Sequence, residues 1–287
     1  MRVKQPIILL SLFLLCFSAC TQDNTKYIMF ERPGYKFPYK LNLPDQTWKL
    51  PHSLFEISGL SFVDDNRLAC VQDEKGIIYL FSLTDGKIES EIVFGDNGDY
   101  EGIEIVEKDA WVLQSKGSLI RVTDYQQKGA PVVKKYPTAL SGKNDTEGLA
   151  YDPVSKSLLI ACKEQPFTEG PIREDYRSVY SFSLESGLLQ PEPFLLISVD
   201  SLRSTKNFKP SGIAIHPATG HIYIMGSVGK LLLVYDRNKE LLAIVKLSPQ
   251  LFPKPEGICF SPDGTLYISS EGAGGSGTIL KFKPESQ

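Results

Sequence analysis

The sequence predicts an all-β fold, a five-bladed β-propeller of four-stranded antiparallel blades, and three observations support it. The first is a motif of Glu or Ser, then Gly, then a large apolar residue, which occurs five times. Its glycines are Gly59, Gly102, Gly148, Gly212 and Gly257. The second is their spacing, because three of the four steps (43, 46, 64 and 45 residues) are close to the length of one propeller blade. The third is a succession of short strand-like segments separated by turn residues, with little helical periodicity.

The first repeat illustrates the order of elements expected in each blade. Strands are predicted over residues 58–63, 68–72, 77–83 and 88–94, with turn residues between them. The motif opens the first of these strands. Because small residues allow close approach of backbones, this strand is expected to be the innermost one, where the blades converge. Glu104 interrupts the pattern of small residues two positions after the Gly, and the sequence offers no explanation for it.

The last repeat contains only three predicted strands, over residues 256–261, 265–270 and 278–282. Residues 39–50, which precede the first repeat, contain strand-like pieces without a partner. We therefore expect this N-terminal strand to complete the last blade. The ring would then be closed and two exposed sheet edges would disappear.

The 64-residue step has two possible origins. Residues 165–171 form a loop rich in Pro and Gly, and residues 200–209 form a second insertion, so both could be additions to the third blade. A sixth blade is the alternative. Because no sixth copy of the motif is present, five blades are favoured.

The N-terminus is typical of an export signal. Arg2 and Lys4 precede an apolar run over residues 7–17, and Ser18-Ala19-Cys20 follows. We expect residues 1–20 to be a lipoprotein signal peptide, with Cys20 becoming the lipidated first residue that holds the protein on a bacterial membrane. A simple secretory signal is the alternative, since Phe17 stands where Leu is usual. The run is too short for a permanent membrane span.

The remainder of the chain is expected to form a tether over residues 21–38 and a single propeller domain over residues 39–287. We expect a monomer in the cell envelope, either periplasmic or on the cell surface. Removal of residues 1–20 leaves 29 basic residues against 34 acidic ones, a net charge of −5. No basic stripe is present, which disfavours nucleic-acid binding. Cys70, Cys162 and Cys259 lie in apolar runs typical of buried free thiols, and their odd number defines no disulfide framework.

Candidate functional residues stand directly before the motif glycines. In a propeller, the starts of the inner strands surround one mouth of the central channel, and the ends of the second strands return to the same mouth. The second strands end in Asp73-Glu74, Lys163-Glu164 and Ser270-Glu271. The residues before the glycines are Ser58, Glu101, Glu147, Ser211 and Glu256.

Up to seven carboxylates would therefore meet at this mouth, with Lys116 and Lys163 as the evident counter-charges. Like charges at close range raise each other's pKa, and a bound cation would relieve the repulsion. Ca²⁺ takes six to eight oxygen ligands, and the hydroxyls of Ser58 and Ser211 could contribute. Zinc and copper are disfavoured because no His or Cys recurs at these positions. Alternatively, the glutamates accept hydrogen bonds from neighbouring backbones and fasten the blades together.

Six motifs are shared with a known family: Glu56-Ile57-Ser58-Gly59-Leu60, Asp99-Tyr100-Glu101-Gly102-Ile103, Thr146-Glu147-Gly148-Leu149-Ala150-Tyr151, Ala161-Cys162-Lys163-Glu164, Pro255-Glu256-Gly257-Ile258 and Leu266-Tyr267-Ile268-Ser269-Ser270-Glu271. Taken together, they resemble the SdiA-regulated family of bacterial envelope proteins. The resemblance implies a five-bladed propeller, an exported N-terminus and a calcium site, and Ser115-Lys116 departs from the acidic residues that family members can carry there. The acids that the resemblance assigns to the metal are Glu101, Glu147, Glu164, Glu256 and Glu271.

Two functions agree with these observations. The first is a non-catalytic calcium-binding module that binds a small ligand or an envelope protein over its channel mouth. The second is a calcium-dependent hydrolase of phosphate esters or lactones, in which Glu147 or Glu164 would act as the base. The acid cluster without an evident nucleophile favours the first.

Overall fold

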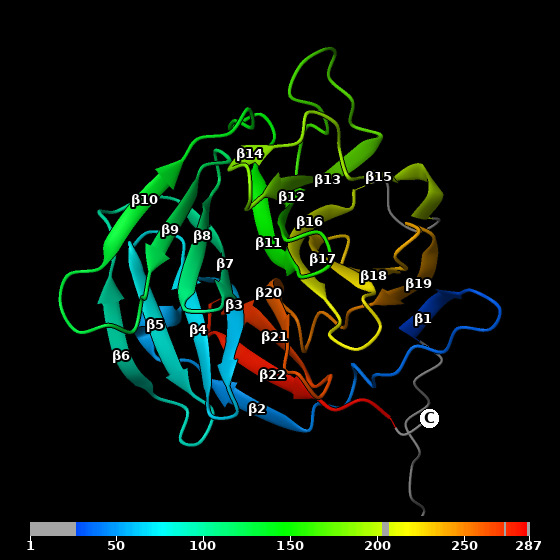
Figure 1. The fold of residues 1–287 in the computed structure, drawn as a ribbon. Helices are drawn as coiled ribbons and strands as arrows, with labels where there is room; N and C mark the ends of the chain where they lie inside the picture. Colours follow the sequence, from blue (N-terminus) through cyan, green and yellow to red (C-terminus); the bar gives the residue numbers. More distant parts are fainter. Residues whose placement is uncertain (1–26, 203–206, 273, 286–287) are drawn as a thin grey trace, which may run out of the picture.

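The strands form five separate antiparallel sheets arranged as a ring (Figure 1). The structure, a computed structural model, describes residues 27–202, 207–272 and 274–285. The predicted five-bladed β-propeller is confirmed. The first blade consists of β3 (Ile57–Asp64), β4 (Arg67–Gln72), β5 (Ile77–Ser82) and β6 (Ile88–Val93). The second consists of β7 (Tyr100–Val106), β8 (Asp109–Gln114), β9 (Leu119–Thr123) and β10 (Val132–Tyr136).

The third blade explains the long step between repeats. Its inner strands are β11 (Thr146–Asp152), β12 (Ser157–Cys162) and β13 (Tyr176–Ser183). The outer position is divided between β14 (Leu188–Leu189) and β15 (Leu195–Ser198), which both pair with β13. A short 3-10 helix, η3 (Asp200–Leu202), follows. The extra residues are therefore additions to one blade, and the described residues contain no sixth sheet.

The N-terminal segment extends the fourth blade and completes the fifth. The fourth blade consists of β16 (Lys209–Ile215), β17 (Ile222–Val228), β18 (Leu231–Tyr235) and β19 (Leu241–Lys246), and β1 (Ile28–Glu31) pairs with β19. The fifth consists of β20 (Lys254–Phe260), β21 (Leu266–Glu271), β22 (Thr278–Phe282) and β2 (Gln46–Lys49). The pairing of β2 with β22 confirms that an N-terminal strand closes the last blade.

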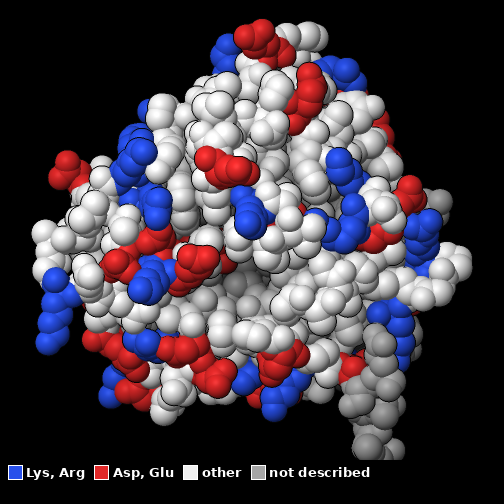
Figure 2. All heavy atoms as spheres, viewed as in Figure 1, with Lys and Arg blue, Asp and Glu red and all other residues white. Residues whose placement is uncertain are grey.

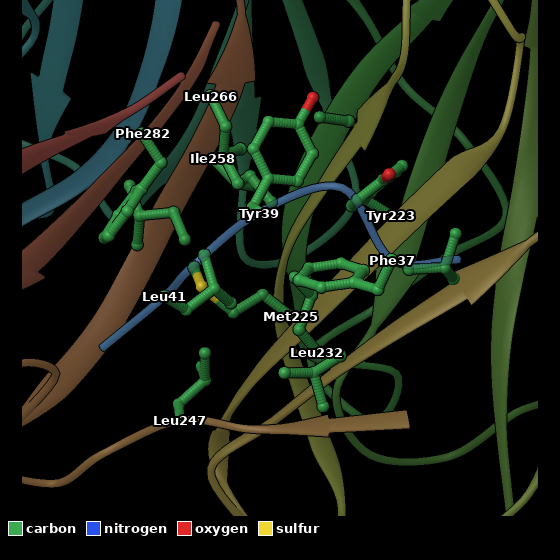
Figure 3. Packing of buried hydrophobic residues seen from close by; sticks show 14 of the residues in the cluster. Phe37, Tyr39, Leu41, Tyr223, Met225, Leu232, Leu247, Ile258, Leu266 and Phe282 are labelled. Atoms are coloured by element: carbon green, nitrogen blue, oxygen red, sulfur yellow. The ribbon is translucent and has the colours of Figure 1, made fainter. Parts of the chain in front are cut away.

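The expected tether over residues 21–38 differs from the structure in its described part. Ile28–Glu31 is a strand, and Phe37 is buried beside Tyr39 and Leu41 between the fourth and fifth blades (Figure 3). The Glu31 carboxylate accepts a hydrogen bond from the Phe37 backbone N–H at 2.7 Å. Apolar burial therefore holds this segment on the propeller. The expected signal peptide over residues 1–20, with Cys20, lies outside the described residues. No helix in the described part of the chain is long and apolar enough to cross a membrane.

Close approach of the inner strands explains the motif glycines. A Cβ atom on Gly59 would lie 2.9 Å from the Gly102 Cα, and one on Gly212 would lie 2.5 Å from the Glu256 carbonyl oxygen. One on Gly257 would lie 3.0 Å from the Leu60 backbone nitrogen, which closes the ring from the last blade to the first. Between successive blades, apolar side chains form five clusters of buried residues. The three cysteines Cys70, Cys162 and Cys259 are buried and free.

Candidate functional site at the channel mouth

The residues before the motif glycines line one narrow cavity at the start of the inner strands. Ser58, Glu101, Glu147, Ser211 and Glu256 contribute to its wall, one from each blade. The volume is about 10 Å³, which is room for about one water molecule. The channel itself therefore excludes organic ligands. Any larger ligand would have to bind in front of it, at the mouth.

A recurring irregularity directs these five side chains toward the axis. Each inner strand departs from regular pairing with its neighbour at the Glu or Ser position, between Ile57 and Gly59 in the first blade and between Tyr100 and Gly102 in the second. The other three inner strands show the same shift. A β-bulge re-aims a side chain that would otherwise alternate between the two faces of the sheet. The sequence motif identified these five residues but did not predict the bulge.

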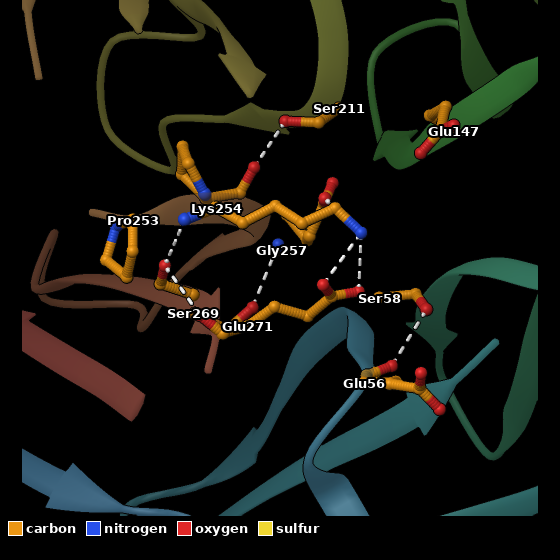
Figure 4. A network of polar contacts seen from close by, with 12 residues as sticks. Glu56, Ser58, Glu147, Ser211, Pro253, Lys254, Gly257, Ser269 and Glu271 are labelled. Carbon is orange, nitrogen blue, oxygen red and sulfur yellow. Dashed lines mark hydrogen bonds and ion pairs between the residues drawn. The ribbon is translucent and has the colours of Figure 1, made fainter. Parts of the chain in front are cut away.

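Lysine side chains neutralise most of the expected acidic residues. Lys163 contacts the buried Glu147 and lies 3.6 Å from Asp145. The Lys254 ammonium group lies 2.7 Å from Glu271 and 3.5 Å from Glu256. Figure 4 shows Lys254 directed at Glu271, with Ser58, Ser211 and Glu147 on the surrounding strands.

A third lysine contact lies nearer the rim of the mouth, where Lys209 pairs with Glu164. All five acids that the resemblance assigned thus lie at the same end of the propeller, and four of them contact a lysine. Glu101 is the fifth, and the charges that act on it come mainly from Glu147 and Asp99, with Lys163 as a weaker opposing charge.

Burial and neighbouring acids raise the pKa of several of these groups. Burial, the Glu147 carboxylate and a hydrogen bond with Asp99 raise the pKa of Glu101 to about 10. Burial and Glu147 raise the pKa of Glu256 to about 8. Burial opposes the charged form of Lys163 as well, but the Glu147 and Asp145 carboxylates outweigh it, so the pKa of Lys163 is raised. The mouth is therefore an acidic site with built-in ammonium groups.

A second ring of charged residues surrounds the first, three positions before each glycine. Its members are acidic in the first three blades and basic in the last two: Glu56, Asp99, Asp145, Lys209 and Lys254. This regularity is visible in the sequence, but the predicted site did not include most of these residues. Both acidic and basic side chains gather around the central hollow of the molecule (Figure 2).

The donor chemistry of the mouth suits a cation only in part. In favour, Asp73 Oδ1 is buried with no hydrogen-bond partner, and burial together with the Glu56 charge raises the pKa of Asp73 to about 6. Against it, four of the five expected calcium ligands already contact a lysine. The described residues also contain no group of three or more acidic, His or Cys side chains placed to hold a metal. As arranged, the residues do not fit a calcium site.

Hydroxyl and carboxyl groups on the inner strands, including Ser211 at the mouth, fasten the blades together. Ser211 Oγ donates a hydrogen bond to the Pro255 carbonyl at 2.7 Å, and Thr146 Oγ1 donates to the Gln114 carbonyl at 2.8 Å. Glu104 accepts a hydrogen bond from Ser61 Oγ at 3.0 Å and one from the backbone of Tyr151. The alternative role of connecting blades thus belongs to Glu104, whereas Glu147 and Glu256 contact lysines.

The fold resembles several solved propellers. Myxococcus xanthus glutaminyl cyclase aligns with a TM-score of 0.57 and 12% identity over 85% of this chain and 96% of that one. The PQQ-bound aldose sugar dehydrogenase of Streptomyces coelicolor gives 0.53 and 13% over 85% and 98%. A protein described as a putative gluconolactonase gives 0.52 and 14% over 84% and 93%. At such identities the similarity concerns the fold.

The family comparison is more specific. The family model described as SdiA-regulated matches residues 35–273, which include every inner strand and all the acids of the mouth. The chain belongs to the SdiA-regulated family.

Proposed function

We propose that this protein is an exported monomeric propeller, held on a bacterial envelope membrane by a lipid on Cys20. It binds a small ligand or an envelope protein at its mouth without catalysing a reaction. The observation that carries the proposal is the set of acid–lysine contacts at the mouth. Glu147 and Glu164, the two carboxylates that the hydrolase would use as its base, contact Lys163 and Lys209. The Ser211 hydroxyl donates to a backbone carbonyl, so it does not face a general base.

The distribution of charge indicates which chemistry the partner carries. Lysines from the third, fourth and fifth blades neutralise acids on their own side, whereas acids on the first and second blades keep acidic neighbours. Asp73 lies close to Glu56 and Glu74, and Glu101 lies close to Asp99. A cationic group placed there would relieve repulsion that the folded protein otherwise retains. The proposed partner therefore presents an ammonium or guanidinium group to this side of the mouth.

Titration with spermidine, a simple polycation, tests this part of the proposal by calorimetry and by thermal denaturation. Binding is expected to be saturable, to weaken as salt rises, and to weaken in Asp99→Asn. Glu91→Gln is the matched control, because Glu91 is an exposed acid on the outer strand of the first blade. Equal binding by the two variants would contradict the assignment to the mouth.

Calcium is kept as a separate hypothesis for the same acids, because the family resemblance implies it. A calcium ion would have to displace Lys163 or Lys254 from its carboxylates, so the structure gives this hypothesis little support. If calcium binds, its addition raises the melting temperature and a chelator lowers it. An unchanged melting temperature, with no metal detected after calcium exchange, would leave the lysines as the cations of the site.

The alternative function is a calcium-dependent hydrolase of phosphate esters or lactones. The lysines at the mouth favour it, since Lys163, Lys209 and Lys254 would attract a phosphate. Screening the purified protein against phosphate esters and lactones, with and without calcium, distinguishes the two. Hydrolysis that disappears in a folded Glu147→Gln variant would overturn the non-catalytic proposal.

A further inference from the structure

A second cavity lies at the opposite end of the propeller from the mouth, between the fourth and fifth blades. Its volume is about 300 Å³, the lower limit for pockets that hold small organic ligands. His216, which lines it, directly follows the end of β16, whose start lies at the mouth. We propose that this cavity binds a neutral sugar ring, independently of what occupies the mouth.

The wall of this cavity is a built part of the protein. Residues 34–38, which connect β1 on the fourth blade to β2 on the fifth, form one side of it. They are fastened at both ends, because the Tyr35 backbone N–H donates to the Arg32 carbonyl at 3.0 Å and the Glu285 backbone N–H donates to the Pro38 carbonyl at 2.7 Å. Tyr39 also donates a hydrogen bond to the Gly264 carbonyl at 2.7 Å. The segment thus closes over the junction of the two blades and leaves a cavity of fixed shape.

Aromatic rings and hydrogen-bonding groups share the lining. The rings of Tyr35 and His221 meet edge to face with centroids 5.6 Å apart, and both are half-buried. Behind them, the Tyr35 and Tyr223 hydroxyls lie 3.4 Å apart. Asp263 lies at the rim, with its carboxylate exposed on one side. A sugar ring matches this combination, since it offers a C–H face to an aromatic ring and hydroxyl groups to imidazole, phenol and carboxylate.

The charges around the cavity favour a neutral ligand. Glu285 is already paired with Lys40, and Asp263 accepts hydrogen bonds from Ser261 and Thr265. Burial lowers the pKa of both imidazoles, which indicates that the surroundings oppose a positive charge at this place. The two rim carboxylates oppose an anion in the same way, and the ammonium group of Lys36, which also lines the cavity, opposes a cation. A neutral polar ring avoids both penalties.

The three histidines of the chain can serve as NMR probes of binding to this cavity. His216 and His221 line the cavity, whereas His52 is exposed and lies on η2 (His52–Leu54), outside it. The imidazole signals of the full-length protein are followed by NMR during titration with glucose, N-acetylglucosamine and maltose, and with choline as the cationic comparison. At least one of the sugars is expected to shift the signals of His216 and His221 saturably, while the His52 signal stays in place.

Two variants test the same assignment. Tyr35→Ala removes one ring and is expected to weaken sugar binding about fivefold or more. His221→Ala does the same without altering residues 34–38, which covers the case in which Tyr35→Ala fails to fold. Glu164→Gln at the mouth is the control and should leave sugar binding unchanged. The proposal is overturned if no sugar gives a saturable shift, if all three histidine signals move together, or if choline binds instead.

Discussion

The channel buries carboxylates at two levels, and it stabilises them in different ways. At the mouth, Glu147 and Glu256 lie among other acids, and Lys163 and Lys254 supply the opposite charge. Glu104 lies on β7, three residues after Glu101, and forms no ion pair with the residues that the structure describes. It lies among hydrogen-bond donors, with Ser61 Oγ at 3.0 Å, and burial raises its pKa to about 8. Burial raises the pKa of acids at both levels, but lysines contact the acids at the mouth, whereas hydrogen bonds from hydroxyl and backbone groups stabilise Glu104.

The difference shows where binding capacity remains. An acid that is neutral and hydrogen-bonded to its own neighbours, like Glu104, has little to offer a ligand and holds blades together. Acids stabilised by mobile lysine side chains can exchange one cation for another. The mouth is therefore the level of the channel at which a partner can be recognised. Substitutions at the two levels should change the stability of the protein by different amounts and for different physical reasons.

The largest effect is expected from Lys163→Met. This change leaves Glu147 buried without its countercharge, and the loss of one partner of a buried pair costs about 3–5 kcal/mol. Since Lys163 is partly exposed, we expect about 3 kcal/mol of lost unfolding free energy, measured by urea denaturation.

Two further variants distinguish the loss of the ion pair from the loss of packing by the lysine side chain. Lys209→Met removes the partner of the more exposed Glu164 and should cost less than about 1 kcal/mol. Lys163→Met combined with Glu147→Gln should regain much of the lost stability. If the double variant is as unstable as Lys163→Met, packing of the lysine stem is the cause and the countercharge explanation is wrong.

A smaller effect is expected from Gly212→Ala, between the two levels. The new Cβ would lie 2.5 Å from the Glu256 carbonyl oxygen, so the fourth and fifth blades must move apart. We expect a cost of about 1–3 kcal/mol, seen as a lower urea midpoint. Gly142→Ala is the control, because its Cβ would meet no atom closer than 4.0 Å. A cost at Gly142 as large as at Gly212 would show that close approach of the strands is not the reason for the motif glycine.

The sequence predicted the repeat architecture well because each blade repeats one local pattern. Motif glycines, turn residues and the unpaired strand-like residues 39–50 sufficed to predict five blades and the closing strand. Residues 28–38 were missed because their burial depends on contacts with the fourth and fifth blades, which are far away along the chain. The structure brings the acids together at the mouth, whereas their lysine contacts depend on side-chain conformation: Lys163–Glu147 and Lys254–Glu271 each lie within one blade, and Lys209–Glu164 joins two. Lys209 and Lys254 could have been predicted from the charged residue that stands three positions before each motif glycine.

The smallest effect is expected at the deeper level, and it depends on pH. Burial raises the pKa of Glu104 in the folded state from its ordinary value of 4.5 to about 8. Between these values the folded protein binds a proton that the unfolded chain releases, so this group's contribution to stability is complete below about pH 4.5 and is lost as pH rises through 8. Glu104→Gln keeps an oxygen acceptor for Ser61, and because Gln does not titrate, the variant does not lose this stability as pH rises. The variant should therefore melt at a higher temperature than the wild type at pH 9, and the difference should shrink toward pH 5. A difference that stays constant with pH would mean that Glu104 is ionised in the folded protein, and hydrogen bonds alone would then stabilise it.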